Sequence, residues 1–400
     1  IKIDNVKILL VCTEKLPVPC IRGGAIQTYI DGILPFLKRD HEVTVFSVAD
    51  PELPDQEIRD NILYKRSSRK TSEEYYHAVT NFVAGREFNW IVIYNRPKYL
   101  PMVAEVAPNS RFILSMHNEM FHAKKIKPEE AILCLERVEK VVTVSKFIAD
   151  GIAKLFPGYE HKFKPVYAGV DLKLFQPRWI EGLEGKRKEK LAALGLEDKQ
   201  VILYVGRLTD KKGPHLLISA MTKVIKKHPS AVLLIVGSKW YGNNEENGYV
   251  REIKVKAEQL GGAVQMTGFI PPSEVADYFL LGDVFVCASQ WEEPLARVHY
   301  EAMATGLCTI TTGRGGNPEV VIPGKNGIVI TDYENSGAFA DCIDYLLSMP
   351  NKREEMGKRG RELAELYYSW SRVAWDILSI INDSTSMYSS SSLEIFGQTG

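Results

Sequence analysis

Residues 201–237, VILYVGRLTDKKGPHLLISAMTKVIKKHPSAVLLIVG, decide the fold. The stretch begins with the apolar run Val201–Val205 and ends with the apolar run Ala231–Val236. Between them lies an amphipathic segment of helical length, His215–His228. Parallel strands need a long crossover connection, which is usually a helix. The stretch therefore predicts an α/β fold with a parallel sheet.

The same alternation continues in both directions along the chain. Short apolar runs predict further strands, and stretches with helical spacing of apolar residues predict further helices. The chain is thus predicted to hold two doubly wound units of similar size. The additional strands are Lys7–Cys12, Glu42–Val48, Trp90–Tyr94, Arg111–Met116, Val141–Val144, Val264–Thr267, Val284–Ala288, Cys308–Thr311 and Gly327–Ile330. The additional helices are Ala25–Lys38, Ser72–Gly85, Lys146–Phe156, Asn247–Leu260, Glu274–Leu281, Arg297–Thr305 and Asn351–Tyr368.

Glycine and proline between Tyr167 and Gln200 indicate a hinge. A chain of 400 residues is long enough for two separate cores. We predict a first Rossmann-like domain over 1–168 and a second over 169–369. Segment 370–382 has an apolar stripe at helical spacing, so we expect a terminal helix that packs back on the first domain. The serine-rich segment 383–400 is predicted to be a disordered tail.

Composition excludes several classes of protein. Fifty basic residues balance fifty acidic ones, which argues against a nucleic-acid partner that would need an overall basic field. The six cysteines include no Cys-x-x-Cys pair and are interpreted as reduced thiols. No apolar run is long enough for a transmembrane segment, and Ile1–Cys12 leads into a strand rather than resembling a signal peptide. We therefore expect a cytoplasmic protein.

Two glutamates and a glycine-rich loop give the strongest chemical signal. Glu293 and Glu301 stand eight positions apart where a predicted loop leads into a helix, and Gly315 and Gly316 follow the next strand. Carboxylates accept hydrogen bonds from sugar hydroxyls, and backbone N–H groups at glycines hold anions. The alternative is that both glutamates are exposed, with Glu301 forming only a surface ion pair with Arg297.

Basic residues follow the strand Val201–Val205. Gly206 and Arg207 come at its end, and Lys212 follows in the same loop. Open α/β sheets bind ligands at the carboxyl ends of their strands. Arginine and lysine at that place can neutralise a diphosphate leaving group. The pattern favours an anion site over a solvated turn with ordinary surface charges.

Two segments of the first half also follow predicted strands. Gly23 and Gly24 precede the helix Ala25–Lys38, where glycine lets the backbone approach a ligand and a helix start favours negative charge. A glycine pair is often only a turn. His117 follows the strand Arg111–Met116, although a single histidine is more often structural than functional.

Other kinds of site are not predicted. The chain has neither a G-x-G-x-x-G fingerprint nor a Walker A motif, which argues against a dehydrogenase or a P-loop ATPase. No two histidines have the helical spacing of a metal site, and no Asp-x-Asp occurs. We therefore expect no catalytic metal and no bound cofactor.

Taken in order, these motifs resemble those of the family 4 retaining glycosyltransferases of GT-B fold. The resemblance runs from Lys7 to about Ile381. Its most specific part is the spacing of Glu293 and Glu301, followed by Ala-Met-Ala and by Gly-Gly-x-Pro-Glu at 315–319. The stretches 13–19 and 22–27 also resemble the branch that includes the bacterial spore coat protein SA. The less specific motifs are Gly23-Gly24, His117, Val144-Ser145, Gly169-Val170-Asp171, Gly206-Arg207 and Lys212-Gly213.

The resemblance implies two Rossmann-like domains that face each other across a cleft. The second would hold a nucleotide-diphospho-sugar, with a UDP-sugar favoured, and the first would hold a carbohydrate or other hydroxyl acceptor. A hexose would be transferred without a metal and with retention of configuration. Acceptor specificity would depend on first-domain loops such as Thr13–Arg22 and Asp50–Ser72. The coat branch adds spore-coat partners, and incorporation into the coat, to the expectations.

The resemblance also implies a role for each site residue. Arg207 and Lys212 would hold the diphosphate, with Gly206 beside them. Glu301 would accept from the ribose hydroxyls, and Glu293 would face the donor sugar. His117 would contact the transferred sugar. The glycine pairs at 23–24 and 315–316 would bring backbone close to the ligand.

The sequence departs from the family pattern in two places. The usual Glu-Gly-Phe-Gly reads Glu293-Pro294-Leu295-Ala296, so the amide that glycine would supply is lost at Pro294. The usual Pro-Asn-Gly-Val-Asp reads Tyr-Ala-Gly-Val-Asp at 167–171. A second hypothesis is therefore a non-catalytic spore-coat or scaffold protein that retains the fold. A sugar-nucleotide epimerase is a third, minor alternative, for which acid and base carboxylates cannot be placed.

Overall fold

A computed structural model describes residues 5–239 and 246–382. The chain forms two compact units. Of the described residues, the first unit comprises 5–144, 148–167 and 370–382, and the second comprises 145–147, 168–239 and 246–369. Both are α/β units built on largely parallel sheets, which confirms the predicted fold class. The predicted tail, 383–400, lies outside the described residues.

The sheet of the first unit has the strand order β3-β4-β2-β1-β5-β6-β7-β8. Its neighbouring strands run parallel except at one edge, where β3 and β4 are antiparallel. Strand β5 is buried along its whole length, as expected for a sheet covered on both faces. The strands are β1 Lys7–Val11, β2 Glu42–Val48, β3 Gln56–Arg59, β4 Ile62–Ser67, β5 Trp90–Tyr94, β6 Arg111–Met116, β7 Lys140–Thr143 and β8 Phe163–Pro165.

The interpretation of Asp50–Ser72 as a loop was wrong, because this segment contains the β3–β4 hairpin. Asp60 and Asn61 both adopt positive φ, 52° and 64°, between the two strands. Two such residues in succession suit a tight hairpin turn, and Asp and Asn tolerate that conformation well. In β4 the buried residues alternate with less buried ones. The alternation is short and includes the buried Arg66, so the apolar pattern alone did not reveal the strand.

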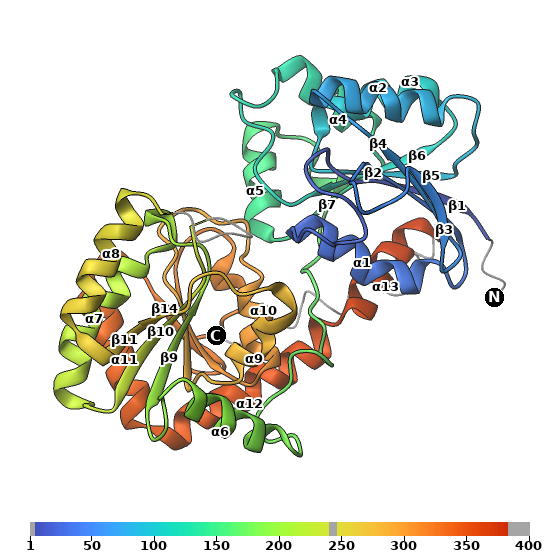
Figure 1. The fold of residues 1–400 in the computed structure, drawn as a ribbon. Coiled ribbons are helices and arrows are strands. Elements are labelled where there is room, and N and C mark those ends of the chain that lie inside the picture. The colour runs from blue at the N-terminus through green and yellow to red at the C-terminus, as the bar shows by residue number, and fades with distance from the viewer. Residues whose placement is uncertain (1–4, 240–245, 383–400) are drawn as a thin grey trace. The chain divides into compact units, whose positions relative to one another are not determined.

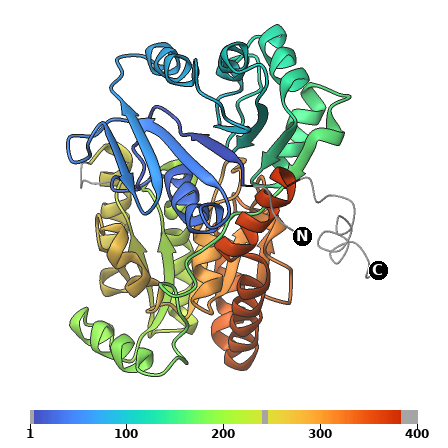
Figure 2. The ribbon, with the colours of Figure 1, turned by 90° about the vertical axis from the view of Figure 1, so that its right-hand side faces the viewer.

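Helices cover both faces of the first sheet. Figure 1 shows α2, α3 and α4 on one face, with α1 and α13 on the other. Helix α13 also lies beside α1 in the turned view of Figure 2. The Tyr29 and Trp370 rings meet edge to face, 5.5 Å apart, and a side chain at Gly32 would strike the Trp370 ring. The helices are α1 Ala25–Leu37, α2 Ser72–Val83, α3 Leu100–Val106, α4 Pro128–Arg137, α5 Lys146–Leu155 and α13 Trp370–Ile381, with 3-10 turns η1 Pro97–Tyr99 and η2 Glu160–Lys162.

The sheet of the second unit is parallel throughout its described strands, in the order β11-β10-β9-β12-β13-β14. Figure 1 shows α7, α8 and α11 on one face and α9, α10 and α12 on the other. The strands are β9 Gln200–Val205, β10 Ala231–Val236, β11 Val264–Met266, β12 Val284–Cys287, β13 Cys308–Thr312 and β14 Gly327–Ile330. The helices are α6 Leu183–Ala193, α7 Pro214–Lys227, α8 Gly248–Gln259, α9 Val275–Phe279, α10 Val298–Ala304, α11 Ser336–Ser348 and α12 Pro350–Tyr367, with 3-10 turns η3 Asp210–Lys212, η4 Gly261–Ala263, η5 Pro272–Glu274 and η6 Asn317–Glu319.

Each sheet contains one point where the direction of strand addition reverses. In the second unit the chain builds outward from β9 to β10 and β11, then returns to place β12 against the other side of β9. In the first unit β1 lies between β2 and β5 in the same way. Connections leave such adjacent strands in opposite directions, so a crevice opens at their carboxyl ends. Within the described residues, no helix is long and apolar enough to span a membrane.

Candidate functional site

In the second unit, the strand reversal brings two predicted site residues into direct contact. Lys212 lies in η3, after β9, and Glu293 lies in the loop after β12. The ammonium of Lys212 donates to Oε1 of Glu293. A backbone bond from Gln290 N to the Lys211 carbonyl, 2.7 Å long, joins the same two loops. Residues 81 positions apart thus form an ion pair because their strands are neighbours.

Glu293 is deeply buried, with 1% of its surface exposed, and so is not the exposed glutamate of the alternative interpretation. Besides Lys212, the indole N–H of Trp291 donates to Oε1 over 2.9 Å, and the Asn317 side-chain amide donates to Oε2 over 3.2 Å. Burial by itself raises the pKa of Glu293, but Lys212 and the hydrogen bond from Asn317 outweigh it and hold the pKa below its usual value. The carboxylate is therefore ionised at neutral pH.

The predicted glycine loop packs on the main chain beside Glu293. The Gly316 N–H donates to the Glu293 carbonyl over 2.8 Å. Gly315 has φ 56°, and a Cβ built there would lie 1.9 Å from that carbonyl oxygen. A Cβ at Gly316 would lie 2.0 Å from the Pro294 carbonyl oxygen. Glycine is therefore required at both positions by close backbone approach, and at Gly315 by the left-handed conformation as well.

Gly206 and Arg207 lie in the same loop as Lys212. The Gly206 N–H extends the hydrogen bonding between β9 and β10 by donating to the Val236 carbonyl over 3.0 Å. The Tyr204 hydroxyl donates to the Arg207 carbonyl over 2.6 Å. A Cβ at Gly237 would lie 1.9 Å from the Gly206 carbonyl oxygen. These contacts fix the backbone from which the Arg207 side chain departs.

Glu301 lies on α10, one turn beyond Arg297. The two side chains form an ion pair with 3.6 Å between Arg297 Nη2 and Glu301 Oε1. Glu301 is only 8% exposed, so this is not a surface pair of the kind considered from the sequence. Burial raises the pKa of Glu301, and Arg297 offsets only part of that effect. A buried carboxyl with a raised pKa is typical of a functional site rather than of a solvated helix face.

In the first unit, His117 follows β6 and is 8% exposed. Its Nε2 lies 3.0 Å from the Ser115 hydroxyl, and the Tyr29 ring meets it edge to face at 4.8 Å. Burial lowers the pKa of His117 to about 3, so its imidazole is neutral at physiological pH. A neutral imidazole can donate or accept one hydrogen bond, and it carries no charge of its own.

Asn95 fixes the backbone at His117 and was not identified from the sequence. It directly follows β5 with φ 59°, and its Oδ1 accepts from the N–H groups of both His117 and Asn118 over 3.0 Å. An asparagine directly after a wholly apolar strand was the available signal, but its left-handed backbone is decided only by the fold.

Gly23 and Gly24 both adopt positive φ, 86° and 102°, before α1 begins at Ala25. A Cβ at Gly24 would lie 2.1 Å from the Gln27 side-chain amide oxygen, whereas a Cβ at Gly23 would meet no atom within 4 Å. The backbone at Gly23 is therefore approachable. Whether a phosphate lies there stays a prediction.

A buried ion pair at the strand reversal of the first unit was also missed. Glu14 follows β1, Arg96 follows β5, and the guanidinium donates to both carboxylate oxygens over 3.0 Å. The Ser72 hydroxyl adds a third bond of 2.9 Å. Glu14 is 2% exposed; burial raises its pKa, but these donors prevail and lower it. The pair ties together the loops after β1 and β5.

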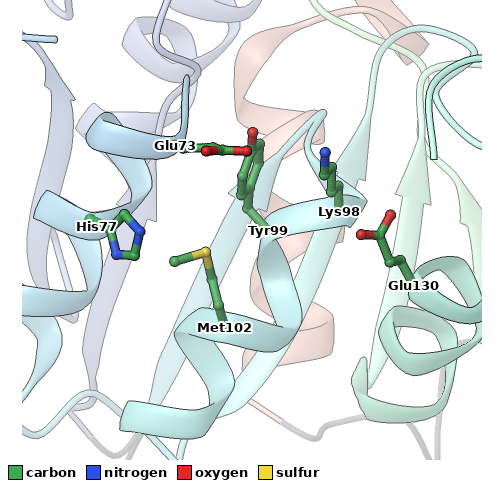
Figure 3. Close-up of a pocket in the computed structure, with 6 residues that line it drawn as sticks. All are labelled: Glu73, His77, Lys98, Tyr99, Met102 and Glu130. Carbon is green, nitrogen blue, oxygen red and sulfur yellow. The ribbon is translucent and has the colours of Figure 1, made fainter. Parts of the chain in front are cut away.

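A pocket of about 230 Å³ lies in the first unit between α2, η1, α3 and α4. Figure 3 shows Tyr99 between Glu73 and Lys98, with Glu130 approaching from α4. Glu130 also accepts from the Lys127 N–H at the start of α4, so it has a helix-capping role. None of the predicted site residues lines this pocket.

The structure thus brings Lys212, Glu293 and the 315–316 loop into direct contact, with the 206–207 loop and Glu301 on adjoining elements of the same unit. His117 and the 23–24 pair belong to the other unit. Among residues 5–239 and 246–382, no three His, Cys, Asp or Glu side chains are arranged to hold a metal ion.

Comparison with known proteins identifies a matching family and relatives that cover more than nine-tenths of the chain. The family described as "Glycosyl transferases group 1" matches residues 186–363. Spore coat protein SA of Bacillus subtilis (strain 168) is 45% identical over 374 residues, which cover 94% of this chain and 98% of that protein. Putative glycosyltransferase YtcC of the same organism is 41% identical over 92% of this chain and 90% of its own length.

A solved structure supports the fold. The crystal structure of Anabaena Alr3699/HepE in complex with UDP-glucose has a TM-score of 0.75 and 20% sequence identity, and the match covers 95% of this chain and all of that chain. At this identity the likeness concerns the fold alone. It confirms the predicted GT-B architecture of two parallel-sheet units.

Proposed function

Because the chain belongs to the group 1 glycosyltransferases, we propose that it transfers a sugar from a nucleotide-diphospho-sugar to a hydroxyl acceptor, with retention of configuration and without a metal ion. The ion pair of Lys212 and the buried Glu293 at the β9–β12 strand reversal carries the proposal. Open α/β sheets bind nucleotides at this place. The pair offers a cation for phosphate and an acceptor for sugar hydroxyls within one loop cluster.

The proposed reaction places charge on the departing nucleoside diphosphate. The bond between the anomeric carbon and the diphosphate oxygen breaks, and the acceptor oxygen bonds to that carbon on the same face. The acceptor proton passes to the departing phosphate. Lys212 and Arg207 would stabilise the developing charge, since fixed positive groups aimed at a leaving group lower the barrier. Glu301 would accept from the ribose hydroxyls and Glu293 from a hydroxyl of the sugar.

The roles of the first-unit residues extend the proposal. His117 would contact the transferred sugar as a neutral imidazole, and Gly23 would bring a backbone N–H to the phosphate. A UDP-sugar is the donor we favour, because HepE, of the same fold, has been crystallised with UDP-glucose. The acceptor is proposed only as a carbohydrate or another hydroxyl compound.

A second candidate is a spore-coat protein that keeps the fold without catalysis. The observation that favours it is Pro294, which has no N–H to offer at a position where the family usually has glycine. The 45% identity to spore coat protein SA supports spore-coat partners for either candidate, with the coat or the cytoplasm as the location.

The experiment that separates the candidates begins with a thermal-shift screen against UDP, GDP, ADP and dTDP and their common sugar conjugates. A ligand that binds only the folded state raises the melting temperature by mass action. We expect a shift with one nucleotide and its sugar that Lys212→Ala abolishes. Lys227→Ala is the matched control, because Lys227 pairs with Asp344 on the surface of the same unit.

Turnover then decides between transferase and scaffold. Incubation with the donor that binds should release free nucleotide in the wild type and not in Lys212→Ala. NMR of the product should show the donor's anomeric configuration. Donor binding without any turnover, with or without a panel of sugar acceptors, would favour the scaffold. Binding of no nucleotide sugar at all would overturn the proposed function.

A further inference from the structure

The carboxylate of Glu293 accepts hydrogen bonds from two side chains in addition to its ion-pair partner Lys212. Lys212 donates to Oε1, Trp291 donates to the same oxygen, and Asn317 donates to Oε2. Asn317 is fully buried, and its own Oδ1 accepts from the Ala296 N–H over 2.9 Å, which fixes the direction in which its NH₂ group points. Trp291 and Asn317 thus hold the carboxylate from two sides.

The proposed function gives Lys212 a second partner. A bound diphosphate would draw the ammonium away from Glu293, since phosphate carries more negative charge than a carboxylate. A carboxylate that is 1% exposed would then lose its counter-charge. An uncompensated buried charge is costly, and the group would take up a proton instead. A protonated Glu293 could no longer act as an ionised acceptor for a sugar hydroxyl.

The ring of Trp291 also lies close to the ammonium groups of Lys211 and Lys212. Its ring lies 6.0 Å from the Lys212 ammonium and 5.7 Å from the Lys211 ammonium. Indole is the aromatic side chain that attracts cations most strongly. The indole N–H therefore donates to Glu293 while the face of the ring attracts the two lysine ammonium groups.

Lys212 is the charged side chain that is hydrogen-bonded to Glu293. Other titratable groups that interact with Glu293 include His299 on α10, Cys287 at the end of β12, and Tyr204 on β9. Burial lowers the pKa of His299, raises the pKa of Cys287 to about 12 and raises the pKa of Tyr204 well above its usual value. All three are neutral at pH 7 and add no positive charge, whereas Trp291 and Asn317 keep donating to the carboxylate when the ammonium leaves.

We propose that Trp291 and Asn317 are positioning residues that keep Glu293 ionised and aimed at the donor sugar when Lys212 turns to the diphosphate. We call the hydrogen bonds from Trp291 and Asn317 to Glu293 the clamp. The inference rests on the proposed function for its ligand, but the clamp itself is a property of the protein alone. Trp291 and Asn317 act through Glu293 and need not contact the substrate.

The first test needs no ligand. Lys212→Met mimics departure of the ammonium, and the carboxyl ¹³C shift of Glu293, assigned with Glu293→Gln, reports its protonation. In Lys212→Met the group should remain ionised at pH 7. Adding Trp291→Phe, which keeps the ring and removes the N–H, should raise the titration midpoint by about one pH unit, a tenfold change in acidity. Adding Trp375→Phe, an exposed tryptophan of α13, should leave it unchanged.

The second test separates positioning from general structural damage. Binding of UDP and of UDP-glucose is measured by calorimetry for wild type, Trp291→Phe and Asn317→Ala. The variants should bind UDP as the wild type does and lose about tenfold in UDP-glucose affinity, because one charge-assisted hydrogen bond is worth about that factor. Equal weakening of both ligands would indicate a structural role and overturn the inference.

The two proposals fail separately. If the wild type binds neither ligand nor any other nucleotide sugar, the proposed function falls, while the titration still decides the clamp. If Lys212→Met/Trp291→Phe and Lys212→Met/Asn317→Ala titrate as Lys212→Met does, the clamp is wrong, whatever the donor.

Discussion

Replacing Lys212 by methionine should destabilise the second unit in a pH-dependent way. Methionine keeps most of the apolar stem and removes the charge, so Glu293 is left buried without its counter-ion. Breaking a fully buried pair costs roughly 3–5 kcal/mol. Here the Lys212 side chain is 23% exposed and Glu293 keeps two hydrogen-bond donors, so we expect about 2 kcal/mol at pH 7. For a unit of this size that corresponds to a melting temperature lower by about 4–8 °C.

The pH dependence follows from the pKa of Glu293. In the wild type this pKa is lowered, so the pair contributes stability that is present above the unfolded-state value and is lost as the pH falls through the folded-state value. Without the lysine, burial raises the pKa, so the folded variant takes up its proton before the unfolded chain does. As the pH falls from 7 to about 4.3, the free energy of unfolding of the variant therefore rises, whereas the Glu293 contribution in the wild type does not change.

Scanning calorimetry at a series of pH values measures this difference. The gap in melting temperature between wild type and Lys212→Met should be largest near pH 7 and should narrow toward pH 4.5. Lys227→Ala, which removes an exposed lysine paired with Asp344, should shift the melting temperature little at any pH. A gap that is absent at pH 7, or that stays constant down to pH 4.5, would refute the assignment of a buried, ionised pair.

Three further predictions concern other parts of the chain. Gly315→Ala should lower the melting temperature and abolish donor binding in the thermal-shift assay, since its Cβ would strike a carbonyl oxygen at 1.9 Å; Gly324→Ala, with φ 76° and no atom within 4 Å, should cost only about 1 kcal/mol and bind normally. Arg96→Met should destabilise the first unit by about 3 kcal/mol at pH 7 in urea unfolding, and addition of Glu14→Gln should restore most of it; no recovery in the double variant would show that the lost charge pair is not the cause. The His117 imidazole should show no titration by NMR between pH 5 and 8, because its pKa is about 3, and a midpoint in that range would contradict its burial.

Local sequence patterns predicted most of the regular elements. Trp90–Tyr94, Ala231–Val236 and Gly327–Ile330 were expected with the bounds that the structure shows, because each is an apolar run closed by polar or glycine residues. The helices α3, α4 and α11 were missed. In α4 two of the first three residues are glutamates, and α3 is a single short run of seven residues, so neither shows a sustained apolar period.

The candidate site was predicted as separate residues but not as an arrangement. Lys212 and Glu293 were each singled out because they follow strands, and the structure adds that they meet. Trp291 and Asn317 were not singled out, since a tryptophan in a loop and an asparagine before a proline have many ordinary uses. Only their distances to one carboxylate give them a role.

The sequence by itself determined the α/β class, most strands and helices, and which loops carry charged or glycine residues. These follow from periodicity and composition within short windows, where neighbouring residues largely determine the outcome. Only the tertiary structure decided which loops meet. The order β11-β10-β9-β12-β13-β14 places the loop after β9 against the loop after β12, and packing over long sequence separations selects that order. The burial of Glu293, and hence its pKa and its need for three donors, is a consequence of that packing.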